Sequence, residues 1–153
     1  MGQPPENRID LLSPLLGSWR TTGEVFEDNG ETLAGSIDGF DHYEALGDSF
    51  VIHRIDVDIG GDPVRGLEVI GPYDSDEGAF RTRAWDNQGG EQVSNAIVKE
   101  DGSMRFGADG ASAVLTFADD GSAATVRWER DVGSGAGGRA WMQLTLTRLS
   151  SPE

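Results

Sequence analysis

One of the two histidines in this sequence, His53, lies where an imidazole could do chemistry. Around it, apolar residues alternate with Arg and Asp over the segment 50–59, which is the period of a β-strand with one buried face. His53 falls in the apolar row with Val51 and Ile55, so its side chain is expected to point inward. A carboxylate beside it would fix the imidazole tautomer and raise the pKa of the ring.

Two neighbouring segments could supply that carboxylate. A three-residue hairpin loop that pairs residues 45 and 49 places Asp41 opposite His53, whereas a two-residue loop places His42 there instead. On the other side, a turn of two glycines places Glu68 opposite His53. Two interpretations stay open: a structural histidine bonded to its neighbours, or a histidine that contacts a ligand or substrate.

A second group of polar side chains lies in the segment 78–86, where Arg81, Arg83 and Trp85 share one face of an expected strand. If that face points inward, two guanidinium groups beside an indole would suit an acidic, partly apolar ligand. If it points outward, the three form a solvated stripe. The opposite face, with Phe80, is smaller and more apolar, which favours the outward interpretation.

These residues must be positioned by β-strands, because short runs rich in Val, Ile, Thr, Phe and Trp alternate with turns containing Gly or Asn from residue 17 onward. Every connection is too short for a crossover helix, so each strand should pair with its sequence neighbour. A meander of ten strands closes into a barrel or exposes two long edges, and closure is favoured. The sequence predicts one all-β domain over 1–153: a segment 1–16 with a short helix capped by Asn7, and an up-and-down barrel over 17–149. The expected strands are 17–27, 32–45, 49–59, 63–71, 78–86, 91–99, 103–107, 111–118, 122–132 and 139–149.

The last two expected strands add further candidates for the barrel interior. Trp128 shares a face with Val126 and is expected in the core, where it could also touch a ligand. Arg130 continues that face and would be a second inward charge near one barrel mouth. Trp141 falls on the polar face of the last strand, exposed or covering a dimer contact. The glycine-rich stretch 133–138 is expected to be a long hairpin loop.

Composition excludes several classes of function. The net charge of −15 opposes binding to nucleic acids and anionic membranes, which need clustered Lys and Arg. The absence of cysteine excludes disulfides, thiolate nucleophiles and zinc–thiolate sites. There is no spaced metal-ligand motif, no apolar run of membrane-spanning length and no signal-peptide pattern, so we expect a cytoplasmic monomer or homodimer without a metal.

The segment Leu15-Leu16-Gly17-Ser18-Trp19-Arg20 resembles the Gly-x-Trp opening of calycin-type barrels such as the lipocalins. That resemblance implies that Trp19 closes the base of the barrel and that Arg148, from the last strand, lies across it. The segments 50–57, 67–71, 81–89 and 128–130 are similar to an uncharacterised bacterial lipocalin-like family, which implies the fold but not a function. Nitrobindin-type haem barrels share the opening but ligate iron through a histidine near the C-terminus. No histidine follows His53 here, so no cofactor is expected.

Three functions remain from different classes. The first is a binding protein whose barrel holds a small apolar or amphipathic molecule, with His53 and one or more of Asp41, Glu68, Arg83 and Arg130 orienting its polar end. The second is a cofactor-independent isomerase, decarboxylase or hydratase in which His53, paired to a carboxylate, is the general base. The third is a structural or interaction protein with a filled barrel. A cavity of roughly 300 Å³ or more favours the first.

Overall fold

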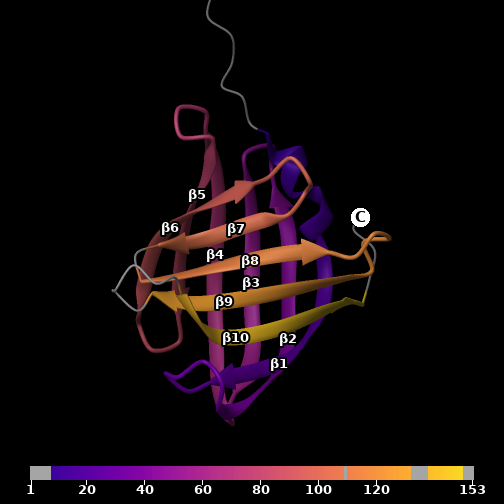
Figure 1. The fold of residues 1–153 in the computed structure, drawn as a ribbon. Helices are drawn as coiled ribbons and strands as arrows, with labels where there is room; N and C mark the ends of the chain where they lie inside the picture. Colours follow the sequence, from indigo (N-terminus) through magenta and orange to yellow (C-terminus); the bar gives the residue numbers. More distant parts are fainter. Residues whose placement is uncertain (1–7, 109, 132–137, 150–153) are drawn as a thin grey trace, which may run out of the picture.

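The computed structural model describes residues 8–108, 110–131 and 138–149, and it contains a closed antiparallel barrel of ten strands (Figure 1). Each strand pairs with its sequence neighbours, and β1 pairs with β10 to close the barrel, which confirms the expected meander. The strands are β1 (Gly17–Phe26), β2 (Leu33–Leu46), β3 (Phe50–Ile59), β4 (Asp62–Asp74), β5 (Ala79–Asp86), β6 (Glu91–Val98), β7 (Met104–Ala108), β8 (Ala111–Phe117), β9 (Ala123–Asp131) and β10 (Gly138–Arg148). The expected loop over 133–138 falls mostly outside the described residues.

The largest departure from the expected boundaries is in β4, which was predicted to end at Gly71 and instead continues to Asp74. Pairing with β5 shifts between Ile70 and Tyr73 and then resumes, so β4 contains a local irregularity and continues beyond it. Tyr73 then packs against Phe80 of β5 with ring centroids 4.9 Å apart. The strand continues because its neighbour offers both backbone partners and an apolar contact beyond the irregularity.

A short 3₁₀ helix, η1 (Ile9–Leu15), precedes the barrel. Its side chains Leu12 and Leu15 are fully buried against Trp19 and the strands, so η1 plugs one end of the barrel. The helix ends with Pro14 inside its last turn, in line with the one or two turns that the sequence predicted. The predicted N-cap, Asn7, lies outside the described residues. No helix in the described part of the chain is long and apolar enough to cross a membrane.

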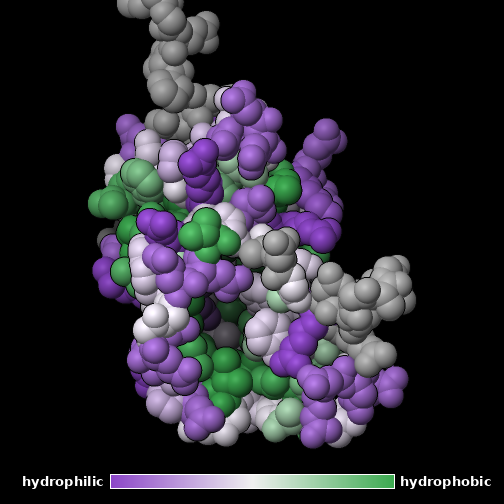
Figure 2. Space-filling model, turned by 90° about the vertical axis from the view of Figure 1, so that its left-hand side faces the viewer, coloured by the Kyte–Doolittle hydropathy of each residue, from purple (hydrophilic) through white to green (hydrophobic). Residues whose placement is uncertain are grey.

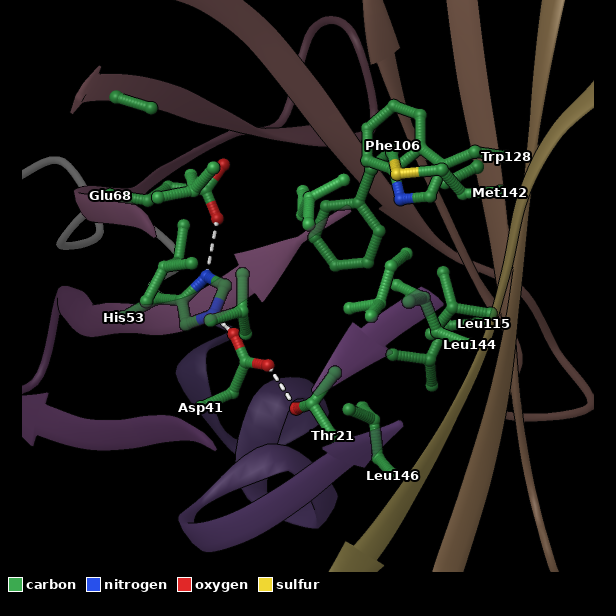
Figure 3. A pocket seen from close by; sticks show the side chains of 18 of the residues that line it. Thr21, Asp41, His53, Glu68, Phe106, Leu115, Trp128, Met142, Leu144 and Leu146 are labelled. Carbon is green, nitrogen blue, oxygen red and sulfur yellow. Dashed lines mark hydrogen bonds and ion pairs between the residues drawn. The ribbon is translucent and has the colours of Figure 1, made fainter. Parts of the chain in front are cut away.

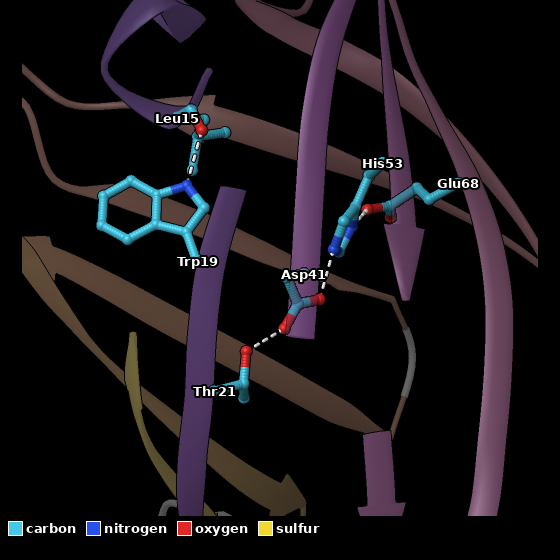
Figure 4. Close-up of polar contacts among 6 residues, drawn as sticks. All are labelled: Leu15, Trp19, Thr21, Asp41, His53 and Glu68. Carbon is cyan, nitrogen blue, oxygen red and sulfur yellow. Dashed lines mark hydrogen bonds and ion pairs between the residues drawn. The ribbon is translucent and has the colours of Figure 1, made fainter. Parts of the chain in front are cut away.

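The plugged end is fastened by Trp19 and Arg148, which come from the first and last strands. The indole Nε1 of Trp19 donates to the Leu15 carbonyl at 2.8 Å (Figure 4). The Arg148 guanidinium lies 4.1 Å from the centre of the Trp19 ring and donates to the carbonyls of Leu16, Pro14 and Gly121 at 2.6, 2.7 and 3.1 Å. One side chain therefore ties η1 to the seam where the barrel closes.

The strands form two crossed layers, with β2–β4 running upright behind and β7–β10 running across in front (Figure 1). Glycines permit the close approach that this bending requires. A Cβ at Gly39 of β2 would clash with the backbone of Asp56 and Val57, and one at Gly23 of β1 would clash with the backbone of Gln143.

Removing the Arg148 side chain tests how the barrel end is held. We expect Arg148→Ala to lower the free energy of unfolding by about 2 kcal/mol or more, because three carbonyls lose a charged donor and the indole loses its cation. Arg83→Ala is the control, because its side chain is mostly exposed and pairs with Glu91 only at 3.5 Å, an interaction worth about 0.5 kcal/mol or less. Urea unfolding of both variants makes the measurement. Equal losses would contradict the account.

Candidate functional site

His53 lies on the inward face of β3, as the alternation predicted. It is buried, with an exposed fraction of 8%, while the flanking Arg54 is exposed. Its imidazole stacks on the ring of Tyr43 from β2, with centroids 4.0 Å apart and planes 10° from parallel. The phenol ring of its cross-strand neighbour therefore fixes the plane of the imidazole.

The pairing of β2 with β3 differs from both registers considered for the sequence. The loop contains three residues, but it joins Leu46 to Phe50, so Tyr43 is opposite His53 and Asp41 is opposite Ile55. The expected pairings of Asp41 or His42 with His53 are therefore wrong. Asp41 still reaches His53, because inward side chains diagonal across a strand pair remain within reach of each other. The pairing of Glu68 with His53 across β3 and β4 is confirmed.

Both imidazole nitrogens of His53 are hydrogen-bonded to carboxylates (Figures 3 and 4). Nε2 is 2.6 Å from Oδ1 of Asp41, and Nδ1 is 3.0 Å from Oε1 of Glu68. The other Asp41 oxygen, Oδ2, accepts a hydrogen bond from the hydroxyl of Thr21 on β1. With a carboxylate at each nitrogen, the ring serves as a donor on both sides, which only the imidazolium can do. Four strands, β1 to β4, are joined through this chain of contacts.

The electrostatics of this cluster agree with its geometry. Burial lowers the pKa of His53, but hydrogen bonds to Asp41 and Glu68, together with their negative charges, outweigh burial and raise that pKa from 6.5 to about 9. Burial and the same two carboxylates raise the pKa of Tyr43 well above 10. At neutral pH the cluster therefore holds a cationic imidazole and a neutral phenol.

The cluster forms the polar end of an internal cavity of about 240 Å³. A hollow with hydrophobic walls is visible on the face shown in Figure 2. Aliphatic residues of β2–β4 flank the polar cluster, and an apolar wall faces it from the other layer (Figure 3). That wall includes Phe106, Leu115, Trp128, Met142, Leu144 and Leu146. The barrel is hollow at this end. The volume of the cavity is somewhat below the roughly 300 Å³ of a site for a drug-sized molecule.

The arginines and the tryptophan of β5 do not line this cavity. Arg81, Arg83 and Trp85 are exposed on the outer face, while Phe80 and Thr82 point inward and are buried. The inward interpretation of this strand, and with it the acidic ligand that Arg83 and Trp85 would have suited, is therefore wrong. The physical reason is that burying the apolar side chain of Phe80 stabilises the fold, whereas burying two guanidinium groups costs free energy.

The candidates on β9 separate in the structure. Trp128 lines the cavity, whereas Arg130 lies outside it, bonded to Asp28 and placed 4.8 Å from the ring centre of Trp141. Trp141 is half-buried rather than exposed, because the pairing of β9 with β10 shifts at this residue and turns its ring onto Trp128, with centroids 5.9 Å apart. Arg130 is thus part of an aromatic and ionic contact outside the cavity, not an inward charge.

Sequence reasoning missed two members of the polar cluster. Thr21 follows Trp19 at the strand period and therefore points inward, a position that the alternation could have revealed. Tyr43 is two residues after Asp41 on β2, so the same alternation places it on the inward face. Their role depends on the register between strands, and this register cannot be predicted from the alternation within one strand.

The donor set does not suit a metal ion. In the described residues no group of three or more His, Cys, Asp or Glu side chains is arranged to hold one. Both nitrogens of His53 face carboxylate oxygens, so neither presents a lone pair to an incoming cation. His42 is bonded to Ser18, 2.8 Å away, outside the cavity lining.

Comparisons with known proteins support the fold and do not identify a function. No protein-family model and no curated protein matches the chain. Among solved structures, the crystal structure of Rv2717c from M. tuberculosis is similar, with a TM-score of 0.66 and 14% identity over 96% of this chain and 100% of that one. A redesigned β-barrel, mFAP0, bound to DFHBI has a TM-score of 0.49 and 14% identity over 88% and 99% of the two chains. The likeness to Rv2717c fits a lipocalin-like barrel in the general sense, and at this identity it concerns the fold alone.

The raised pKa of His53 makes stability depend on pH in a defined direction. The stabilisation is fully present below the unfolded pKa of about 6.5 and is lost as the pH rises through about 9. We expect the free energy of unfolding of the wild type to fall by on the order of 3 kcal/mol across this window. Tyr43 does not titrate there, because its pKa lies higher still.

The control variants separate His53 from other groups. His53→Gln should show little of this slope, whereas His42→Gln should keep it, because His42 is bonded to Ser18 and not to the cluster. Chemical unfolding at a series of pH values measures the slope. A wild-type stability that is flat, or that rises, between pH 6.5 and 9 would contradict the assignment of a doubly bonded imidazolium.

Proposed function

We propose that this protein binds a small, largely apolar molecule inside its barrel. The observation that carries the proposal is the combination of an internal cavity with aliphatic and aromatic walls and a single polar cluster at one end. Ligand sites commonly have this form: apolar walls supply affinity, and a few fixed polar groups orient the molecule. The modest volume favours a ligand smaller than a typical drug molecule.

The uneven packing of the interior supports this proposal. Near η1 the interior is filled by large side chains, including Trp19, Phe80 and Met104, each fully buried. At the other end, side chains of similar chemistry leave a cavity. An unfilled apolar space forfeits dispersion contacts that a close-packed core would make, and a bound molecule restores them. Fixed polar groups in such a space are a further cost that ligand recognition would explain.

The geometry argues against the two alternatives, an enzyme with His53 as general base and a structural protein with a filled barrel. A general base needs an unprotonated atom, but both nitrogens of His53 are engaged by carboxylates, and its pKa is raised to about 9. A purely structural protein would be expected to fill its core. The exposed apolar side chains Phe40, Val93 and Val114 lie on three different strands, β2, β6 and β8.

We further propose that residues 1–153 form one domain and that it belongs to the bacterial lipocalin-like family its segments resemble. The closed topology supports this, because no strand of the described chain is left for a second sheet. The family assignment also rests on the position of Trp19 beneath Arg148, at the plugged end.

Binding can be followed through Trp128, which lines the cavity. Nitrobenzene, a neutral apolar quencher, should quench part of the tryptophan fluorescence saturably, because that part reports occupation of the cavity. Trp128→Phe should remove most of the saturable component. Trp85→Phe is the matched control and should retain it, because Trp85 is exposed on the outer face and is quenched only by collision. Quenching that is linear in concentration for the wild type would contradict a binding cavity.

A further inference from the structure

The ionisable side chains at the cavity wall carry an excess of negative charge. Among the described residues that line it, the ionisable groups besides the Tyr43 phenol are Asp41, His53 and Glu68, and no Lys or Arg is present. Two carboxylates facing one imidazolium leave one negative charge uncompensated. The arginines that could have offset this charge lie on the outer face, Arg83 with Glu91 and Arg54 with Glu44.

The hydrogen bonds of the cluster leave this negative charge available on Glu68. Asp41 uses both oxygens, one for His53 and one for Thr21, and His53 uses both nitrogens. Glu68 uses Oε1 for His53, while its Oε2 accepts no hydrogen bond from any described residue. The side chain of Glu68 is largely buried, with an exposed fraction of 18%. A carboxylate oxygen that borders an apolar cavity without a donor is an unused strong acceptor.

The surroundings of Glu68 leave space for a donor. Register places Glu68, Ala84 and Gln92 in one row across β4, β5 and β6, and all three line the cavity. The central member of the row has the smallest side chain, so the cavity extends beside the carboxylate. The polar neighbours, Gln92 and Ser94, are neutral, and Ser94 is bonded to Thr82 at 2.6 Å.

From this arrangement we infer that the ligand of the cavity is an organic cation, a protonated amine carried on a small apolar body, with its ammonium group bound by Glu68. The inference rests on the proposed binding function and names its ligand class. An ammonium would complete the hydrogen bonding of Glu68 and cancel the net charge of the cluster, at low dielectric where both effects are strong. An acid of the same size would meet an uncompensated carboxylate, while the one cationic group, His53, already has both nitrogens bonded to carboxylates.

A series of near-isosteric probes tests this inference at pH 7: benzylamine, benzyl alcohol and benzoate. Isothermal titration calorimetry should show benzylamine binding about tenfold more tightly than benzyl alcohol, as expected for a charge-assisted hydrogen bond in place of a neutral one, with benzoate weakest. If benzyl alcohol binds as tightly as benzylamine, or benzoate binds best, the cation preference is overturned while the binding function stands. If none of the three binds, both are overturned.

Two variants show whether Glu68 is the source of the preference. Glu68→Gln keeps the size of the side chain but removes its charge, so benzylamine should lose its advantage while benzyl alcohol binds nearly as before. Glu44→Gln is the matched control, because Glu44 is exposed on the outer face and pairs with Arg54 at 3.7 Å. Equal loss of the advantage in both variants would show a general effect of the acidic surface and would overturn the assignment to Glu68. Fluorescence spectra of each variant verify that it is folded.

Discussion

The ion pairs of His53 with Asp41 and Glu68 join three adjacent strands from inside the barrel, and the character of the cavity depends on them. Removing charged groups from water costs several kcal/mol per ion, which mutual attraction repays only when the hydrogen bonding is nearly complete. Here it is complete for the imidazole and for Asp41, and one oxygen of Glu68 remains. Buried ionic groups of this kind are weak evidence for stability, because apolar residues of similar size often do as well. Under the proposed binding function, their role is to orient a molecule in the cavity.

The rest of the structure divides into an end that is filled and an end that is hollow. At the filled end η1, Trp19 and Arg148 close the barrel, and backbone carbonyls that the helix leaves unpaired are satisfied by the guanidinium of Arg148. This rigid end fixes β1 and β2, and through them Thr21, two residues after Trp19 on β1, and Asp41, which is opposite Trp19 on β2. Because the side chains of the cluster are anchored from four strands, the polar end of the cavity is formed before any ligand arrives. Such preorganisation lowers the cost of binding.

Much of the fold could be predicted from the sequence, because a period of two and short turns leave few topologies for ten strands. The inward position of His53 followed from the same alternation. The contact between Asp41 and His53 was anticipated, but from a register that is wrong, since a hairpin loop of given length does not determine which residues pair beside it. The apolar residues on the opposite face of its strand favoured an outward position for Arg83 but did not determine it. The position of Trp141 depends on a shift in pairing within β10, which leaves no mark in the apolar pattern. The unpaired oxygen of Glu68 emerges only when side chains from several strands are placed together.

The most direct test of this account is the protonation state of His53 in the folded protein. Nitrogen-15 NMR of the imidazole side chains at pH 7.5, with His42→Gln used to assign the signals, distinguishes a doubly protonated ring from either neutral tautomer. The account predicts that both nitrogens of His53 carry a proton and that both protons are protected from exchange by Asp41 and Glu68. A neutral ring with one bare nitrogen would contradict it, because His53 would then be an available base and the cluster could not be the fixed, ion-paired end of a binding cavity.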